Sequence, residues 1–232
     1  MSSHHIVRDN QEPALIIANG EACSLALMHE LMEWSPKVVV LDGALPRVLE
    51  LGLKVDVWLG DFDSGAEEEL LKGEFANSPQ LSHIQRVHTP DQEFTDLQKA
   101  FHFLLGDGFS AVNVVWATGR RQDHHLNNIF TLARYSDRLT INFLDDYGRV
   151  FASPKKFKKW YPKNTDISLI PCGKALGVTT QNLVWNLNNE TLELPERTSS
   201  SNRVLADGFV EIEYIEGHLL IMECWDKREF NV

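Results

Sequence analysis

The sequence predicts an α/β fold, in which a doubly wound, mostly parallel sheet domain is followed by an all-β, antiparallel, sandwich-like domain. In the first part of the chain, short runs of Val, Ile and Leu alternate with amphipathic stretches, as in a parallel sheet with helices on both faces. After Gly148, prolines interrupt the chain, helical periodicity is lost, and short strand-like runs alternate with Asn, Gly and Pro turns. We therefore expect two domains, residues 1–147 and residues 148–232.

The strand-like runs predict where the strands lie along the chain. Those of the first domain cover residues 14–19, 37–42, 55–60, 84–88, 112–117 and 139–144. Helices are expected between most of them, including residues 65–72, residues 96–105 and a helix ending near Tyr135. The runs of the second domain cover residues 166–171, 176–180, 183–187, 191–195, 202–206, 209–215 and 218–224. The stretch 155–163 before them stands out as a basic run.

Composition and charge exclude several classes of protein. The formal net charge of -11 would repel a phosphate backbone, which argues against nucleic-acid binding. No stretch approaches the roughly 20 apolar residues that span a bilayer, so we expect no membrane segment. The polar N-terminus lacks a secretory pattern, which predicts a cytoplasmic protein. The three cysteines lack the spacing of a disulfide framework or a zinc site.

Acidic residues follow several expected strands of the first domain. Asp42, Asp61 with Asp63, Asp91 and Asp123 each come shortly after a strand-like run. In an open α/β sheet, the carboxyl ends of the strands line the edge where ligands bind. Carboxylates held together repel one another unless a cation lies among them, and hard oxygen ligands suit Mg²⁺, which also engages substrate phosphates. The pattern indicates a site for a metal-bound nucleotide.

Two of these acidic motifs also have an ordinary structural explanation. In the segment 60–64, two carboxylates leave a strand end together, but Asp63 or Ser64 would equally cap a following helix. Asp96 is a candidate ligand, but it would equally serve as the first-turn acid of the helix that it opens. Taken singly, each motif leaves both explanations open.

The segment 117–128 combines a glycine, two arginines and an acid between a strand and a helix. Glycine lets the backbone approach a ligand, and the planar fork of arginine suits phosphate oxygens. The alternative is a solvated turn in which Arg121 forms a salt bridge with Asp123. His124 and His125 would face different directions on a helix, which argues against zinc.

Several common catalytic signatures are absent from the sequence. There is no Gly-x-x-x-x-Gly-Lys-Ser/Thr loop, so a reaction with ATP cannot rely on that phosphate cradle. The nucleophile elbow and the Gly-x-Gly-x-x-Gly turn are missing as well, so acyl transfer and hydride transfer lose support.

Taken in order, the motifs resemble those of the thiamine pyrophosphokinase family. They are residues 42–44, 60–64, 91–100 and 119–129 in the first domain, and residues 177–180, 183–187 and 199–202 in the second. Each is weak alone, but the ordered set is specific and covers nearly all of the chain from Ala14 to Glu223. The resemblance implies an α/β catalytic domain, a β-sandwich-like thiamine-binding domain, and Mg²⁺-dependent transfer of pyrophosphate from ATP to the hydroxyl of thiamine.

The resemblance also implies roles for individual residues. Mg²⁺ would be held by Asp61, Asp63 and Asp96. The ATP phosphates would be contacted, or their site organised, by Gln92, Thr95, Arg121 and Asp123, with Asp42 beside them. The thiamine rings would be seated by Trp185, Ser200, Ser201 and Asn202, in the crevice of the partner chain of a homodimer. The expected catalytic residues are Asp96, Arg121 and Asp123, and either carboxylate is a candidate acceptor of the hydroxyl proton.

The chain departs from the family pattern at two places. It has Leu45-Pro46 within a segment that usually reads Asp-Gly-Gly-Ala-Asn, and Arg120 where Gly-Gly-Arg is usual. Loss of a glycine beside the phosphates could narrow the pocket, or Arg120 could supply a further phosphate contact.

Three other functions use the same residues. The carboxylates would also serve a metal-dependent phosphohydrolase acting on a nucleotide or a thiamine phosphate. They would equally serve a pyrophosphokinase for another alcohol, such as a pterin. A binding-only protein is disfavoured, because clustered acids without a task are costly.

Overall fold

The computed structural model describes residues 13–34, 36–62 and 81–225, and its contacts divide the chain into two units, residues 1–129 and residues 130–232. The domain boundary that the sequence predicts between residues 147 and 148 stays a prediction. The predicted fold class is confirmed, because a parallel α/β part precedes an antiparallel β part. No helix in the described ranges is long and apolar enough to cross a membrane.

The N-terminal unit is built on parallel strands in the order β4-β3-β2-β1-β5. These strands are β1 (Ala14–Ile17), β2 (Val38–Leu41), β3 (Val57–Gly60), β4 (Gln85–His88) and β5 (Ala111–Val115). All residues of β1, β2, β3 and β5 are buried, which explains their continuous apolar sequence. The edge strand β4 is mostly exposed, and its sequence is correspondingly polar.

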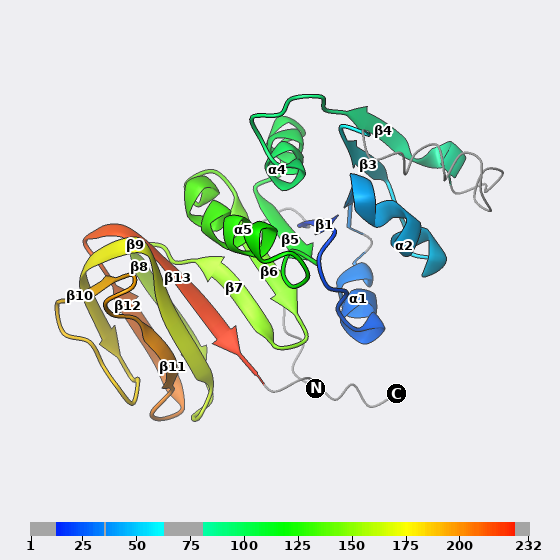
Figure 1. The fold of residues 1–232 in the computed structure, drawn as a ribbon. Coiled ribbons are helices and arrows are strands. Elements are labelled where there is room, and N and C mark those ends of the chain that lie inside the picture. Colours follow the sequence, from blue (N-terminus) through cyan, green and yellow to red (C-terminus); the bar gives the residue numbers. More distant parts are fainter. Residues whose placement is uncertain (1–12, 35, 63–80, 226–232) are drawn as a thin grey trace. The chain divides into compact units, whose positions relative to one another are not determined.

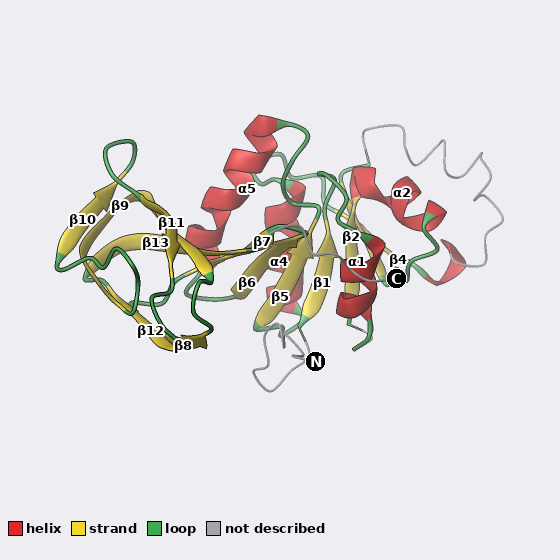
Figure 2. Cartoon of the chain, turned by 90° about the horizontal axis from the view of Figure 1, so that it is seen from below, coloured by secondary structure: helices red, strands yellow, loops and turns green. Residues whose placement is uncertain are grey.

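Helices cover this sheet on both sides. They are α1 (Leu25–Met32), η1 (Asp42–Ala44), α2 (Leu45–Glu50), η2 (Leu81–His83), α4 (Asp96–Gly106) and α5 (Gln122–Tyr135), the last of which crosses the division between the units. The chain moves along the sheet in one direction from β1 to β3 and in the opposite direction from β4 to β5. Because the connections between parallel strands are right-handed, α1 and α2 lie on one face of the sheet and α4 lies on the other. Figures 1 and 2 show this arrangement.

The C-terminal unit is an antiparallel β structure organised around one long strand. The strands are β6 (Thr140–Asp145), β7 (Gly148–Ala152), β8 (Lys156–Tyr161), β9 (Asp166–Gln181), β10 (Glu190–Glu193), β11 (Ser199–Arg203), β12 (Gly208–Glu213) and β13 (Glu216–Cys224). Their order is β6-β7-β13-β9-β12-β8, and β10 and β11 also pair with β9. Buried residues from β9, β12 and β13 dominate its core, among them Leu169, Ile212 and Ile221.

The C-terminal unit differs from the sequence prediction in three segments. The runs 166–171 and 176–180 form a single strand, β9, whose register shifts against β13 near Gly217. The run 183–187 is a turn with one isolated bridge, because its backbone amides bond to the side chains of Thr180 on β9 and Asn202 on β11 rather than forming a ladder. The basic run contains strand β8, whose exposed face carries Lys156, Lys158 and Trp160 and whose inward face carries Phe157, Lys159 and Tyr161.

Candidate active site

The strand order of the N-terminal unit reverses between β1 and β5. From β1 the chain moves outward to β2, β3 and β4, and then returns to the opposite side of β1 as β5. The segments that leave the carboxyl ends of β1 and β5 run together, because Gly20 and Glu21 donate backbone hydrogen bonds to Trp116 (2.6 Å) and Thr118 (2.8 Å). Such a switch point is the expected ligand-binding edge of an open α/β sheet.

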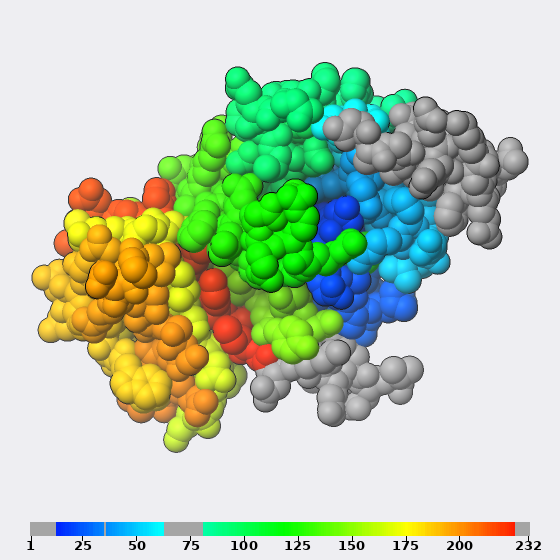
Figure 3. Space-filling model, in the orientation of Figure 1, coloured from blue at the N-terminus to red at the C-terminus, as the bar shows by residue number. Residues whose placement is uncertain are grey.

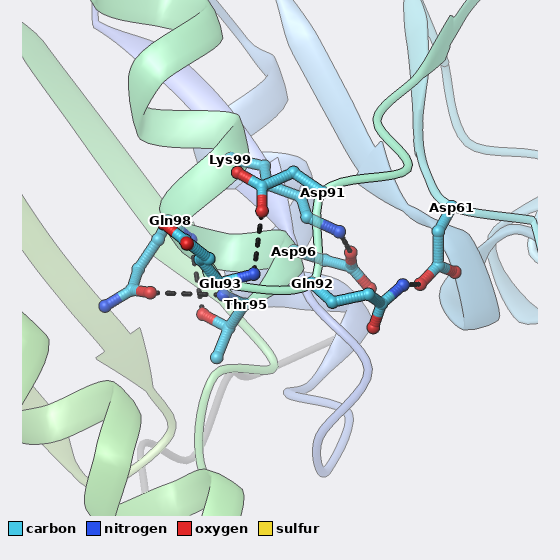
Figure 4. Close-up of polar contacts among 8 residues, drawn as sticks. All are labelled: Asp61, Asp91, Gln92, Glu93, Thr95, Asp96, Gln98 and Lys99. Carbon is cyan, nitrogen blue, oxygen red and sulfur yellow. Dashed lines mark hydrogen bonds and ion pairs between the residues drawn. The ribbon is translucent and has the colours of Figure 1, made fainter.

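Two of the predicted acidic motifs meet at this edge. Asp61 follows β3, and Gln92 lies in the segment that precedes α4. The Gln92 amide Nε2 donates a hydrogen bond of 3.0 Å to Asp61 Oδ2, although the two residues are 31 positions apart (Figure 4). Asp61 is half-buried and Gln92 is exposed, so both side chains remain accessible to a ligand. Asp63 lies outside the described residues.

Asp96 opens helix α4 and is held by a neighbouring lysine. Thr95 caps the helix, and a reciprocal pair of hydrogen bonds with Gln98 forms a complete capping box. Lys99 Nζ lies 3.2 Å from Asp96 Oδ1, and the Lys99 side chain is only 6% exposed (Figure 4). The capping explanation therefore holds for Thr95, while the Asp96 carboxylate neutralises a buried ammonium and is itself partly open to solvent.

Asp42 is the buried acid of the edge. It begins η1 directly after β2 and is 4% exposed. Trp58 Nε1 donates a hydrogen bond of 3.2 Å to its carbonyl oxygen. A Cβ added at Gly60 would lie 2.4 Å from Asp42 Cβ, so only glycine at that position leaves room for the Asp42 side chain. The pair explains why a glycine ends β3 immediately before Asp61.

Arg121 and Asp123 are exposed and bound to each other. Arg121 NH2 lies 2.5 Å from Asp123 Oδ2, and Arg121 Nε lies 3.1 Å from Asp123 Oδ1. The hydrogen bond from Arg121 lowers the pKa of Asp123 to about 2, while the same contact raises the pKa of Arg121. This is the salt-bridged turn that the sequence left as an alternative. In this state the Asp123 carboxylate is a weak base.

Two further arginines occupy the same edge. Arg47 on α2 donates a hydrogen bond of 3.0 Å to the carbonyl oxygen of Gly20, and its guanidinium lies 4.4 Å from the Trp116 ring centroid. Arg120 donates a hydrogen bond of 3.2 Å to Asn19 Oδ1. Sequence reasoning missed Arg47, which gave no signal other than its place five residues after Asp42. For Arg120 the sequence offers a further phosphate contact as one consequence of its departure from the family pattern.

The residues predicted to seat thiamine lie in the C-terminal unit. Trp185 is 63% exposed, whereas Asn202 is buried. Asn202 Oδ1 accepts from the Trp185 backbone N (3.2 Å), and its Nδ2 donates to the Trp185 carbonyl (2.8 Å) and to Ser199 Oγ (3.1 Å). Asn202 thus fixes the backbone that presents the Trp185 indole, and its own amide faces the protein.

The two predicted serines flank this clamp on β11. Ser200 is exposed. Ser201 has a positive φ of 54°, and its backbone N donates a hydrogen bond of 2.9 Å to Ser168 Oγ on β9. The local register shift of β11 against β9 therefore sets the direction of both side chains.

The donor set at the edge of the N-terminal unit suits Mg²⁺. Within the described ranges, no group of three or more His, Cys, Asp or Glu side chains is close enough to hold an ion. Asp61 and Asp96 nevertheless supply hard carboxylate oxygens, and Mg²⁺ typically needs only one or two carboxylates together with water and substrate phosphates. Together with Arg47, Arg120 and Arg121, these acids form a set of side chains of the kind that suits a metal-bound phosphate ligand.

Comparison with protein families assigns both parts of the chain. Residues 28–143 match the model of the thiamin pyrophosphokinase catalytic domain, and residues 155–219 match that of the thiamin pyrophosphokinase vitamin B1 binding domain. The chain belongs to the thiamin pyrophosphokinase family.

Individual relatives and solved structures agree with this assignment. A rice thiamine pyrophosphokinase 1 is 31% identical over 171 residues, which cover 68% of this chain and 62% of the rice protein. A Caenorhabditis elegans thiamin pyrophosphokinase 1 is 26% identical over 86% of this chain and 84% of its own length. The fold is similar to that of thiamine pyrophosphokinase from Bacillus subtilis, with a TM-score of 0.74 and 21% identity over 92% of this chain and 99% of that one. The yeast enzyme has a TM-score of 0.76 and 16% identity over 94% and 88%.

Proposed function

We propose that this protein transfers a pyrophosphoryl group from ATP to the hydroxyl of thiamine, giving thiamine diphosphate and AMP. The observation that carries the proposal is the hydrogen bond between Gln92 and Asp61. It joins two motifs distant in sequence at the binding edge of a parallel sheet, in a chain that belongs to a thiamin pyrophosphokinase family.

In the proposed reaction, the thiamine oxygen forms a bond to the β-phosphorus while the bond from that phosphorus to the oxygen shared with AMP breaks. The hydroxyl proton passes to a base or to water, and AMP leaves with the shared oxygen. Catalysis of this kind depends on positioning and on neutralising charge, so no covalent enzyme intermediate is required. Mg²⁺, held by Asp61, Asp63 and Asp96, would supply positive charge to the triphosphate.

The protein's own groups have distinct tasks in this scheme. Gln92 joins the segment before α4 to Asp61 after β3, and Thr95 fixes the start of the helix that carries Asp96. Asp42 would lie beside the phosphates. Arg121 would turn from Asp123 towards the phosphates, which would free Asp123 and raise its proton affinity. Asp96 and Asp123 therefore both stay candidate bases.

The test is to incubate the purified protein with ATP, Mg²⁺ and thiamine and to separate the products. Equal amounts of AMP and thiamine diphosphate are expected. Production of ADP or free phosphate would reject pyrophosphoryl transfer in favour of a kinase or a phosphohydrolase. Replacing thiamine by other alcohols in parallel identifies a different acceptor if thiamine fails.

We further propose a homodimer in which Trp185, Ser200 and Ser201 of one chain seat thiamine in the crevice of the other. The exposed and clamped Trp185 supports this arrangement, because a large indole held rigidly on a surface is suited to stacking on a flat ring. The cytoplasmic location stays a prediction.

A complementation experiment tests the shared site. Asp96→Asn and Trp185→Ala should each be nearly inactive alone. A heterodimer purified by two different tags, with one variant on each chain, should recover about half of the wild-type activity, because one of its two sites is then intact. An inactive heterodimer, or a chain that remains monomeric while fully active, would reject the shared site.

A further inference from the structure

Two arginines converge on one side-chain oxygen at the switch point between β1 and β5. Arg120 NH1 lies 3.2 Å from Asn19 Oδ1 and 3.4 Å from the Asn19 carbonyl oxygen. Arg47 NH1 lies 3.5 Å from the same Oδ1 and 3.0 Å from the carbonyl oxygen of Gly20. The two guanidinium groups reach this point from α2 and from the segment after β5, so they are brought together by the fold rather than by sequence.

Within the described part of the chain, the charge of this arginine pair is not balanced by a direct ion pair. Among the described residues, neither Arg47 nor Arg120 forms a salt bridge with an acid. Burial and the nearby charge of Arg120 lower the pKa of Arg47, while Glu21 and Glu50 act on it in the opposite direction. Two like charges that share a neutral oxygen favour the arrival of an anion.

The surroundings keep the pair in place and open. The Arg47 guanidinium lies against the Trp116 ring, and Arg120 is exposed. Gly119, at a φ of 74°, passes so close to Glu21 that an added Cβ would lie 2.5 Å from Glu21 Cβ. Figure 3 shows the green segment after β5 directly against the blue segment around β1. The pair therefore faces the ligand-binding edge of the sheet.

We propose that Arg47 and Arg120 bind the phosphate of the nucleoside monophosphate that leaves in the reaction. This inference rests on the proposed function and adds a subsite to it. The acids after β3 and before α4 lie on one side of the edge, where a metal ion would engage the phosphates that are transferred. The arginine pair lies at the switch point, where the nucleotide end is expected. There, two guanidinium groups would neutralise the charge that AMP gains as its bond to the β-phosphorus breaks.

The dissociation constant for AMP, measured by calorimetry without Mg²⁺ and without thiamine, isolates this subsite. The primary variant is Arg120→Gly, because glycine accepts the positive φ of 53° at this position and the fold should be retained. We expect its dissociation constant for AMP to rise about tenfold or more, since a charge-assisted hydrogen bond is lost. The dissociation constant of Arg120→Lys for AMP should lie between those of the wild type and Arg120→Gly, because an ammonium keeps the charge but loses the planar fork of the guanidinium.

Lys156→Gln is the matched control for loss of one positive charge. Lys156 is exposed in the C-terminal unit, and its contact with Glu213 is 3.7 Å. This variant should bind AMP as the wild type does. If folded Arg120→Gly also bound AMP like the wild type, the proposal would be overturned.

Binding of inorganic pyrophosphate, measured in parallel, separates the two ends of the nucleotide. Weakened pyrophosphate binding with unchanged AMP binding would place the pair on the transferred phosphates and would also overturn the proposal. The product assay is independent of both measurements. A wild-type chain that makes thiamine diphosphate while Arg120→Gly keeps normal AMP affinity and Michaelis constant for ATP would refute this subsite and leave the proposed function standing.

Discussion

Asp96→Asn is expected to lower turnover on the order of a thousandfold, because loss of one carboxylate that holds the metal removes several kcal/mol of transition-state stabilisation. The side chain is 36% exposed, so the change affects an open crevice rather than the core. Asparagine keeps an oxygen that can still accept from Lys99, and the fold should therefore be preserved. Steady-state formation of AMP, together with thermal unfolding of the same sample, separates the loss of chemistry from loss of structure.

Two companion variants sharpen this measurement. Asp96→Ala removes the oxygen that faces the buried ammonium of Lys99, and it should lower stability by about 1–3 kcal/mol relative to Asp96→Asn. Glu93→Gln removes an exposed acid three residues earlier and should leave turnover unchanged. A folded Asp96→Asn enzyme that turned over as fast as Glu93→Gln would refute the metal assignment of Asp96.

The location of the acidic edge could be predicted because it follows from strand periodicity. Continuous apolar runs identify buried parallel strands, and the residue after each run must lie at the carboxyl edge. Asp42 and Asp61 are found there without any knowledge of side-chain contacts. The hydrogen bond from Gln92 to Asp61 then depends only on β4 lying beside β3 and on the segment that leads from β4 into α4.

The arginine pair could not be predicted in the same way. Arg47 lies on α2 and Arg120 follows β5, so their meeting at Asn19 depends on the side-chain length of arginine and on the reversal of strand order. Periodicity reports which face a residue occupies, but not how far its side chain reaches. Strand β8 was not predicted for a related reason. Lys159 lies on the inward face between Phe157 and Tyr161, and Trp160 lies on the exposed face, so the sequence does not alternate apolar and polar residues.

Asn202 shows a further limit of motif reasoning. A motif identifies that an asparagine is required, but it does not say whether its amide faces a ligand or the protein. Here its amide bonds to the backbone of Trp185 and to Ser199, which lies in the same strand. Its contribution to thiamine binding would therefore act through the position of the Trp185 indole.

Glu223 is the centre of a buried charge network in the C-terminal unit, and its change should cost substantial stability. Its Oε1 accepts from Arg149 NH2 (2.8 Å), Lys159 Nζ (2.8 Å) and Tyr161 OH (2.5 Å), and the side chain is 9% exposed. Glu223→Gln keeps the shape but leaves two neighbouring cations without their carboxylate. We expect the free energy of unfolding to fall by about 3 kcal/mol. This value is at the lower end of the range for a broken buried ion pair, because Lys159 is partly open to water.

Glu213→Gln is the matched control, since it makes the same chemical change at an exposed pair in the same unit. Glu213 lies 3.7 Å from Lys156, and both side chains are more than half exposed, so the loss should stay below about 0.5 kcal/mol. Urea unfolding, with hydrogen exchange of the β13 amides as the local probe, compares the two variants. Equal free energies of unfolding for the two variants would contradict the stabilisation that we assign to the hydrogen bonds and ion pairs of Glu223.

The pH dependence of the difference between wild type and Glu223→Gln distinguishes charge from shape. Burial alone would raise the pKa of Glu223, but the charges of Arg149 and Lys159 and the hydrogen bonds from Lys159 and Tyr161 lower it overall from 4.5. A carboxyl group with a lowered folded pKa stabilises the fold above its unfolded pKa, and this stabilisation is lost as pH falls through the folded value. The difference should therefore be constant near neutral pH and shrink below about 4.5. A difference that persisted undiminished in acid would mean that packing, and not the carboxylate charge, holds β7, β8 and β13 together at this point.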